Sequence, residues 1–294
     1  MPRAHANNIE LEYDTFGDPS SKPLLLVMGL EAQMINWTDE MCETIANQGF
    51  YVIIFDNRDV GLSTKFEDVD LLNIPEIYSK LAMGENVDIP YTLDDMADDA
   101  VGLLDHLNID KAHICGVSMG GMIAQIIAIR HPTRVLTLTS IASSTGNPEF
   151  YPTPEFQQEI FKPMPTEREA NIEESIRRER LRYGTFPYGE ERARELFTKA
   201  YDRCFYPQGV ERQMLAIVAA GNIKSRLRSI KVPTLVIHGK EDLLVPKEGG
   251  IDAADAIPGA ELLLIDGMGH SLPFPPEVEP QIIEAIIANT NKAT

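Results

Sequence analysis

The feature that most constrains the fold of this chain is a series of short, continuous apolar runs rich in Val, Ile and Leu. Each run is bounded by Gly, Pro or Asp, and they lie at 23–29, 51–56, 112–116, 135–141, 234–239 and 261–267. Strands that are buried on both faces read in this way, which is typical of a parallel sheet. Between them lie helical patterns at 38–47, 92–107 and 119–130. The alternation predicts an α/β fold, with a mostly parallel twisted sheet flanked by helices.

The N-terminal region reads differently from these runs. Residues 8–17 alternate apolar and polar side chains, which predicts a half-exposed antiparallel strand at an edge of the sheet. We interpret the residues before it, including His5, as a loose N-terminus.

A long segment at 145–228 breaks the strand–helix rhythm, because it holds helical patterns at 155–161, 167–183, 190–205 and 210–220 but no strand-like run. It has 14 Lys and Arg against 13 Asp and Glu, whereas the whole chain has a net charge of −19. It also contains 11 of the 21 aromatic residues. We predict a helical cap inserted into a core domain formed by 1–144 and 229–294; an ordinary run of packing helices is the alternative. Aromatic side chains suit an apolar ligand, and the candidates for substrate contact are Phe150, Tyr183 and Phe186.

Composition excludes several classes of protein. With 44% hydrophobic and 24% charged residues, the chain is an ordinary globular one. A net charge of −19 argues against nucleic acid and anionic membranes as partners. No apolar run approaches the roughly 18–20 residues that span a bilayer, and the N-terminus does not resemble a signal peptide. The three cysteines have no metal-binding or redox spacing, so we expect no metal and a reducing cytoplasmic location.

The strongest local signal is a G-x-S-x-G motif at 116–120, centred on Ser118. An apolar run precedes it and a helical pattern follows it, which is the strand–turn–helix context that this motif requires. A nucleophilic serine must stand exposed at the end of a sheet, on a sharp and strained turn. The two glycines remove side chains that would clash across such a turn. Ser118 is therefore the predicted nucleophile.

A serine hydroxyl needs a base, and the base needs an orienting carboxylate. Among six histidines, His270 is the best candidate, because it follows the last apolar run on a loop that carries two glycines. His238 ends an earlier run and lies close to the same edge. Asp242, directly after that run, is the predicted carboxylate, with Glu241 and Asp266 as alternatives. The order Ser118, Asp242, His270 is the one that α/β-hydrolases use.

The negative oxygen that forms on an attacked carbonyl needs hydrogen-bond donors. The helix that starts at Met119 points its N-terminal amides at the nucleophile. The loop after the run 23–29 is the usual place for a second amide. We predict an oxyanion hole formed by the backbone N–H groups of Leu30 and Met119, although Met28-Gly29 can also be a simple turn.

Several separated elements together resemble the α/β-hydrolase superfamily, over roughly residues 8 to 290. Within it, the segments around 24–29 and 267–273 are especially similar to aclacinomycin methylesterases and related carboxylesterases. Trp37, a few residues after the first element, is a candidate substrate contact. The elements that carry the resemblance lie at 27–30, 56–63, 116–121, 232–242 and 267–270.

Two departures from the wider family's pattern leave the predicted triad untouched. Met28 stands where many members have His, and Asp59 replaces the usual glycine after Arg58. Both weaken any inference about substrate. Asp56, Arg58 and Ser63 are interpreted as structural residues.

Ser118 also distinguishes branches of the superfamily, because dehalogenases and epoxide hydrolases of this fold carry Asp there. The resemblance therefore implies a serine-dependent carboxylic ester hydrolase that acts through an acyl-enzyme on a small to medium, mainly apolar ester. It needs no cofactor and no macromolecular partner beyond a monomer or homodimer. The alternatives are a cofactor-free haloperoxidase or perhydrolase, a carbon–carbon bond hydrolase, and a non-catalytic ligand receptor.

Overall fold

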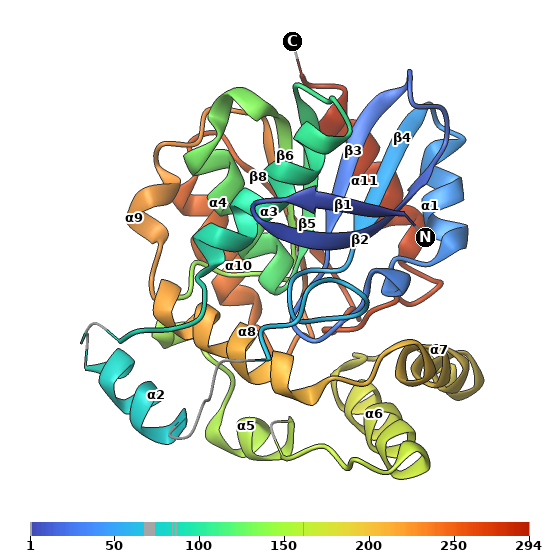
Figure 1. The fold of residues 1–294 in the computed structure, drawn as a ribbon. Coiled ribbons are helices and arrows are strands. Elements are labelled where there is room, and N and C mark those ends of the chain that lie inside the picture. The colour runs from blue at the N-terminus through green and yellow to red at the C-terminus, as the bar shows by residue number, and fades with distance from the viewer. Residues whose placement is uncertain (1, 68–73, 84, 86, 161, 294) are drawn as a thin grey trace.

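A computed structural model describes residues 2–67, 74–83, 85, 87–160 and 162–293. Within this part of the chain, eight strands form one sheet in the order β1-β2-β4-β3-β5-β6-β7-β8 (Figure 1). All pairs from β4 to β8 are parallel, as predicted, and the two N-terminal pairs are antiparallel. The strands are β1 Arg3–Ala6, β2 Ile9–Phe16, β3 Lys22–Val27, β4 Phe50–Phe55, β5 Ala112–Val117, β6 Val135–Ile141, β7 Thr234–Gly239 and β8 Glu261–Ile265.

The structure corrects the expectation for the N-terminus. The alternating segment is antiparallel β2, but β1 pairs with its outer side, so β2 is not the edge of the sheet. His5 lies in β1 and pairs with Glu10 rather than belonging to a loose tail. A strand of four residues, buried only through Ala4 and Ala6, is too short and too weakly apolar to show a period in the sequence.

Alternate residues of the central strands face two separate cores. Leu25 of β3 and Ile53 of β4 belong to one apolar cluster, whereas Leu24 and Val52 belong to the other. Helices α3 (Leu93–His106) and α4 (Met119–Arg130) supply residues to the first cluster, and α1 (Asp39–Ala46) and α11 (Glu279–Thr290) to the second. The sheet is therefore covered on both faces, as a parallel sheet requires.

Helices rather than strands follow β6, as the sequence predicted. They are η3 Pro148–Phe150, α5 Pro154–Ile160, α6 Arg168–Arg182, α7 Glu190–Arg203, α8 Pro207–Ala220 and α9 Lys224–Leu227. Residue 161, the end of one predicted helix, lies outside the described residues. Figure 1 shows α5 to α8 grouped at one end of the sheet, at the bottom of the view, with α2 (Ile74–Ala82) beside them. Ile223 and Leu227, by contrast, pack into the core cluster with α3 and α4.

Ion pairs with buried carboxylates connect this helical group to the loop that follows β4. Arg203 of α7 lies 2.7 Å from Asp56, and Arg212 of α8 lies 2.8 Å from Asp59. Because that loop leaves the carboxyl end of a parallel strand, the helical group lies over the sheet edge where sites of α/β proteins gather. Searched over the described residues, the chain has no helix long and apolar enough to cross a membrane.

Candidate active site

Ser118 occupies a strained turn between β5 and α4. Its backbone angles are φ 55° and ψ −124°, a region that non-glycine residues rarely adopt. The flanking glycines are required by close backbone approach. A Cβ on Gly116 would lie 2.0 Å from the carbonyl oxygen of Gly120, and one on Gly120 would lie 2.1 Å from that of Val27. The sequence motif thus corresponds to a turn that pushes the serine outward at the end of the sheet.

Two loops at neighbouring strand ends bring partners to this serine. His270 follows β8 and Asp242 follows β7. The Nε2 atom of His270 lies 3.0 Å from Oγ of Ser118, and its Nδ1 atom lies 2.7 Å from Oδ2 of Asp242. Asp242 and His270 are both buried. The three residues singled out from the sequence therefore form one continuous chain of hydrogen bonds.

The alternatives for the carboxylate lie elsewhere. Glu241 accepts a hydrogen bond from the backbone N–H of Gly267 at 2.6 Å, and Asp266 pairs with Lys240 at 2.6 Å. Neither contact involves the imidazole of His270. Their positions favour Asp242 as the residue that orients the ring.

The Asp242 carboxylate is held in its charged form. Burial alone would raise its pKa, but the charge of His270 and hydrogen bonds from His238 and His270 lower the pKa to about 2. Its second oxygen, Oδ1, accepts hydrogen bonds from the backbone N–H groups of Leu244 at 2.9 Å and Val245 at 2.8 Å. These donors fix the carboxylate so that Oδ2 faces the imidazole.

His238 is a second histidine in contact with this carboxylate. Its Nε2 atom lies 2.8 Å from the carbonyl oxygen of Val245 and 3.5 Å from Oδ2 of Asp242. A carbonyl oxygen only accepts, so Nε2 carries the proton and donates it. The sequence placed His238 near this edge of the sheet but gave no sign of its contact with Asp242.

Of the two residues predicted for the oxyanion hole, Met119 directly follows the serine in the chain, and Leu30 lies on the loop after β3. Met119 is the first residue of α4 and is buried. Leu30 is half-buried on the loop after β3. That loop passes against the serine, since a Cβ on Gly29 would lie 3.1 Å from Cβ of Ser118 and 3.7 Å from its Oγ. Gly29 therefore permits the close approach that an amide donor at this place needs.

The proposed substrate contacts are less uniform. Trp37 is fully buried and packs against Phe274, with ring centroids 6.1 Å apart, so the structure places it in the core rather than at a binding surface. Phe150 is half-buried and lies near Gly249 of α10 (Lys247–Ala256). Phe186 packs against Gly267, on the loop that carries His270.

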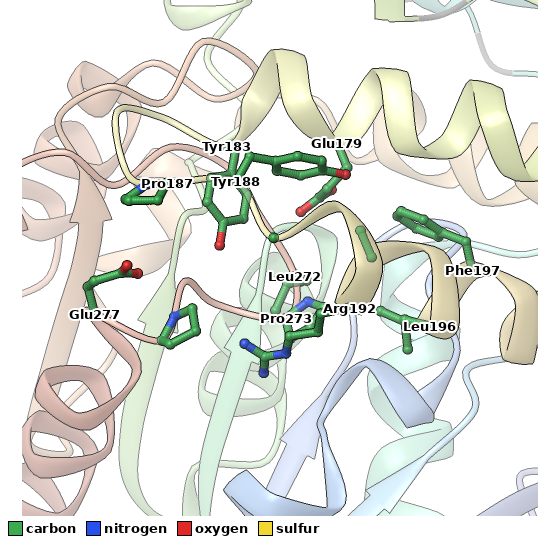
Figure 2. Close-up of a pocket in the computed structure, with 13 residues that line it drawn as sticks. Glu179, Tyr183, Pro187, Tyr188, Arg192, Leu196, Phe197, Leu272, Pro273 and Glu277 are labelled. Atoms are coloured by element: carbon green, nitrogen blue, oxygen red, sulfur yellow. The ribbon is translucent and has the colours of Figure 1, made fainter.

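Tyr183 lines a small cavity. This space of about 90 Å³ lies between α6, α7 and the segment after His270, where Tyr183 and Tyr188 pack edge to face and Leu272 closes one side (Figure 2). Its lining does not include any of the three hydrogen-bonded residues. The cavity therefore adjoins the histidine loop without reaching the serine.

Glu179 of α6, which no sequence pattern indicated, also lines this cavity. It is buried and pairs with Arg182 at 2.9 Å, and burial raises its pKa despite that partner.

No group of three or more His, Cys, Asp and Glu is arranged to hold a metal ion in the described part of the chain. The three cysteines are unpaired thiols.

Comparison with known proteins places this geometry in context. A family model described as the alpha/beta hydrolase fold matches residues 22–275. The chain is 30% identical to rhodomycin D methylesterase of Streptomyces sp. (strain C5), covering 98% of this chain and 97% of the relative. It is 29% identical to rhodomycin D methylesterase of Streptomyces peucetius over the full length of both proteins. These names support the prediction of a hydrolase acting on ester bonds.

A solved structure agrees with the expected architecture. The meta-cleavage product hydrolase of Pseudomonas fluorescens IP01 superposes with a TM-score of 0.78, covering 100% of this chain and 98% of the other. At 20% sequence identity, this likeness concerns the fold alone.

Proposed function

The chain belongs to the alpha/beta hydrolase fold family, and from that membership we propose that it is a serine-dependent carboxylic ester hydrolase. The observation that carries the proposal is the continuous hydrogen-bond chain from Ser118 through His270 to Asp242. Its order and geometry fit a nucleophile, a general base and an orienting carboxylate. The methylesterase names of the two full-length relatives point to the same class of reaction.

The mechanism follows from which atoms face each other. Because the Nδ1–H group of His270 donates a hydrogen bond to Asp242, the lone pair of Nε2 points to the Ser118 hydroxyl. As Oγ attacks the ester carbonyl carbon, its proton passes to Nε2. The tetrahedral intermediate collapses, the alcohol leaves with that proton, and an acyl-serine remains. Water then repeats the sequence, with His270 as base and then as acid, and releases the carboxylic acid and free Ser118.

We assign stabilisation of the developing oxyanion to the backbone N–H groups of Leu30 and Met119. The amide of Met119 opens a helix, where the helix dipole favours negative charge. The loop of Leu30 comes close enough to the serine to supply the second donor. Each such donor is worth about 2.7–4 kcal/mol in the transition state, so losing one should matter nearly as much as losing the base.

The helical segment 145–228 is proposed as a cap that selects the substrate over a core of 1–144 and 229–294. Its ion pairs to the loop after β4 seat it over the sheet edge that carries Ser118. Its aromatic side chains suit a small to medium, mainly apolar ester. We further propose a monomer or homodimer in the cytoplasm, where three unpaired cysteines stay reduced.

The test of this function is hydrolysis of simple aryl and methyl esters by the purified protein, followed by titration of the released acid. Turnover that disappears in Ser118→Ala supports the proposal. Peroxide-dependent bromination in acetate buffer without ester turnover would instead indicate a perhydrolase. Cleavage of a vinylogous diketone alone would indicate a carbon–carbon bond hydrolase, and binding without turnover a receptor.

A further inference from the structure

A side chain from the helical segment reaches the loop that carries Leu30. Gln213 of α8 is fully buried. Its Oε1 accepts a hydrogen bond from the backbone N–H of Glu31 at 3.0 Å, and its Nε2 donates one to the carbonyl oxygen of Arg58 at 2.8 Å. One amide side chain thus connects α8 to two loops, those that follow β3 and β4.

The hydrogen bond from Glu31 to Gln213 lies one residue beyond Leu30, the proposed oxyanion donor. The Leu30 N–H belongs to the peptide group between Gly29 and Leu30. The next peptide group is held through Glu31 N–H by Gln213. The preceding one is held through the carbonyl oxygen of Met28, which accepts a hydrogen bond from Nδ2 of Asn57 at 2.8 Å. The proposed oxyanion donor therefore lies between two anchored peptide groups. Asn57, on the loop after β4, holds one of them, and Gln213 of α8 holds the other.

The conformation of the loop requires such anchoring. Glu31 has a φ of 68°, a strained conformation that a non-glycine residue keeps only where its surroundings hold it. Gly29, which lies close to Ser118, has more backbone freedom than residues that carry a side chain. Without the Gln213 oxygen, the Glu31 N–H would lose its partner, and the loop would have reason to relax away from the serine.

Helix α8 is itself fixed at the neighbouring residue. Arg212 donates two hydrogen bonds to the carboxylate of Asp59, at 2.8 and 2.9 Å, and a third to the hydroxyl of Tyr206 at 2.7 Å. Asp59 is the residue that replaces the family's usual glycine, and it is buried with a φ of 66°. The departure noted in the sequence thus anchors the turn of α8 that presents Gln213.

We infer that Gln213 is a positioning residue for the oxyanion hole, so that the amide of Leu30 is in place only while α8 is seated on the core. This inference rests on the proposed function, because it assumes that Leu30 N–H stabilises a tetrahedral oxyanion. It makes the helical segment part of the catalytic assembly as well as a cover over the substrate.

The test compares Gln213→Met with Gln33→Met. Gln33 is a buried glutamine of the same loop region that also contacts the helical segment, donating hydrogen bonds to the carbonyl oxygens of Ala200 at 2.7 Å and Cys204 at 3.0 Å. Both substitutions remove buried hydrogen bonds to the helical segment, but only the first frees the Glu31 amide. Gln213→Glu is the rescue variant, because a neutral carboxyl group in this place keeps an oxygen for Glu31 and a proton for Arg58.

The readouts are kcat and KM for 4-nitrophenyl acetate and the inhibition constant of trifluoroacetophenone. Ser118 Oγ adds to the carbonyl carbon of this ketone, the C=O π bond becomes an oxyanion, and the serine proton passes to His270. Losing an oxyanion donor outright lowers kcat by about 10²–10³, so displacing one in Gln213→Met should lower kcat by about tenfold or more. KM should change less than about threefold, and the inhibition constant should rise by the same factor as kcat/KM falls.

We expect the control, Gln33→Met, to keep kcat and the inhibition constant within about threefold of wild type, even if its melting temperature falls as much as that of Gln213→Met. Gln213→Glu should recover most of the kcat that Gln213→Met loses. The inference is overturned if Gln213→Met matches wild type in both readouts, or if Gln33→Met loses as much. If the wild type binds the ketone without hydrolysing esters, the proposed function fails. The inhibition constants of the two methionine variants still decide the role of Gln213. Should Gln213→Met not fold, Gln213→Ala is measured in its place, and a kcat and inhibition constant equal to those of wild type would overturn the inference.

Discussion

The Nε2 atom of His270 lies 3.0 Å from Oγ of Ser118, although 152 positions of sequence separate the two residues. The contact arises because β5 and β8 both end at the same edge of one parallel sheet. Asp242, at the end of the neighbouring strand β7, completes the chain from the other side of the imidazole. Three loops that are unrelated in sequence thus meet because parallel strands point the same way.

Ser118→Ala should abolish ester hydrolysis while leaving the fold intact. Ser118→Gly should also be inactive, but no less stable than Ser118→Ala, because glycine adopts the positive φ of this turn at little steric cost. Initial rates and thermal melts of both variants check this. An alanine variant that keeps more than a few per cent of the wild-type rate would remove Ser118 from the mechanism.

Asp242→Asn should lower kcat by roughly 10³–10⁴, as expected when an orienting carboxylate becomes an amide and the imidazole takes the wrong tautomer. The backbone donors of Leu244 and Val245 still find the amide oxygen, so the loop should remain in place. Glu241→Gln is the matched control, since Glu241 bonds Gly267 and not the imidazole. Equal losses in the two variants would contradict the assignment of Asp242.

The stability of the fold should fall in acid. The pKa of Asp242 is lowered from 3.8 to about 2 in the folded protein. Its ionised form therefore stabilises the folded state above about pH 4, and this contribution is lost as the pH falls towards 2. Denaturant unfolding of the wild type and of Asp242→Asn between about pH 5 and pH 2 measures this contribution, because the variant lacks the titrating carboxyl group. Equal losses of stability in the two proteins would contradict a lowered pKa at Asp242.

Gly120→Ala should prevent folding or cost several kcal/mol, because the new methyl group would lie 2.1 Å from the backbone oxygen of Val27. Gly49→Ala is the control. Gly49 has a φ of 89° but nothing within 4 Å of the built Cβ, so its cost should be limited to about 1–3 kcal/mol of backbone strain. Denaturant unfolding of both variants measures the difference, and a Gly120→Ala protein as stable as wild type would rule out the close packing of this turn.

Tyr183→Leu should change the preference among acyl-chain lengths, because Tyr183 lines the cavity beside the histidine loop. Tyr201→Leu is the control, since Tyr201 belongs to the same helical segment but stacks on Phe205 instead. Ratios of kcat/KM for two- and eight-carbon esters should shift by about fivefold or more only in the first variant. A change in melting temperature without a change in preference would indicate that Tyr183 only packs the structure.

Local sequence was sufficient where local backbone chemistry sets the structure. The glycines around Ser118 indicate a tight turn, in which the backbone leaves no room for a side chain at these two positions. Continuous apolar runs indicate buried strands, whose ends determine where the loops meet. His270 and Asp242 could therefore be chosen from their distance beyond a strand end. The sequence did not predict strand β1, because a segment of four residues is too short to show a recognisable pattern of apolar and polar side chains.

Interactions between distant segments had no signal in the sequence. Nothing local indicates that Gln213 bonds the Glu31 amide, or that Asp59 meets Arg212. Trp37 illustrates the opposite error, since its position beside a functional loop suggested a ligand contact whereas its ring fills the core. Such contacts depend on how helices pack on loops in three dimensions, which residue spacing does not encode.

The most direct test of Ser118 as the nucleophile of an esterase is hydrolysis of 4-nitrophenyl esters with acyl chains of two to sixteen carbons, with and without a serine-directed phosphonate. We expect rapid turnover that the phosphonate stops, with mass spectrometry locating the adduct on Ser118 and the chain-length optimum measuring the acyl pocket. Turnover that persists after complete labelling of Ser118, or an adduct on another serine, would contradict the account. Absence of turnover with Ser118 still labelled would leave a reactive nucleophile and overturn the assignment as an esterase.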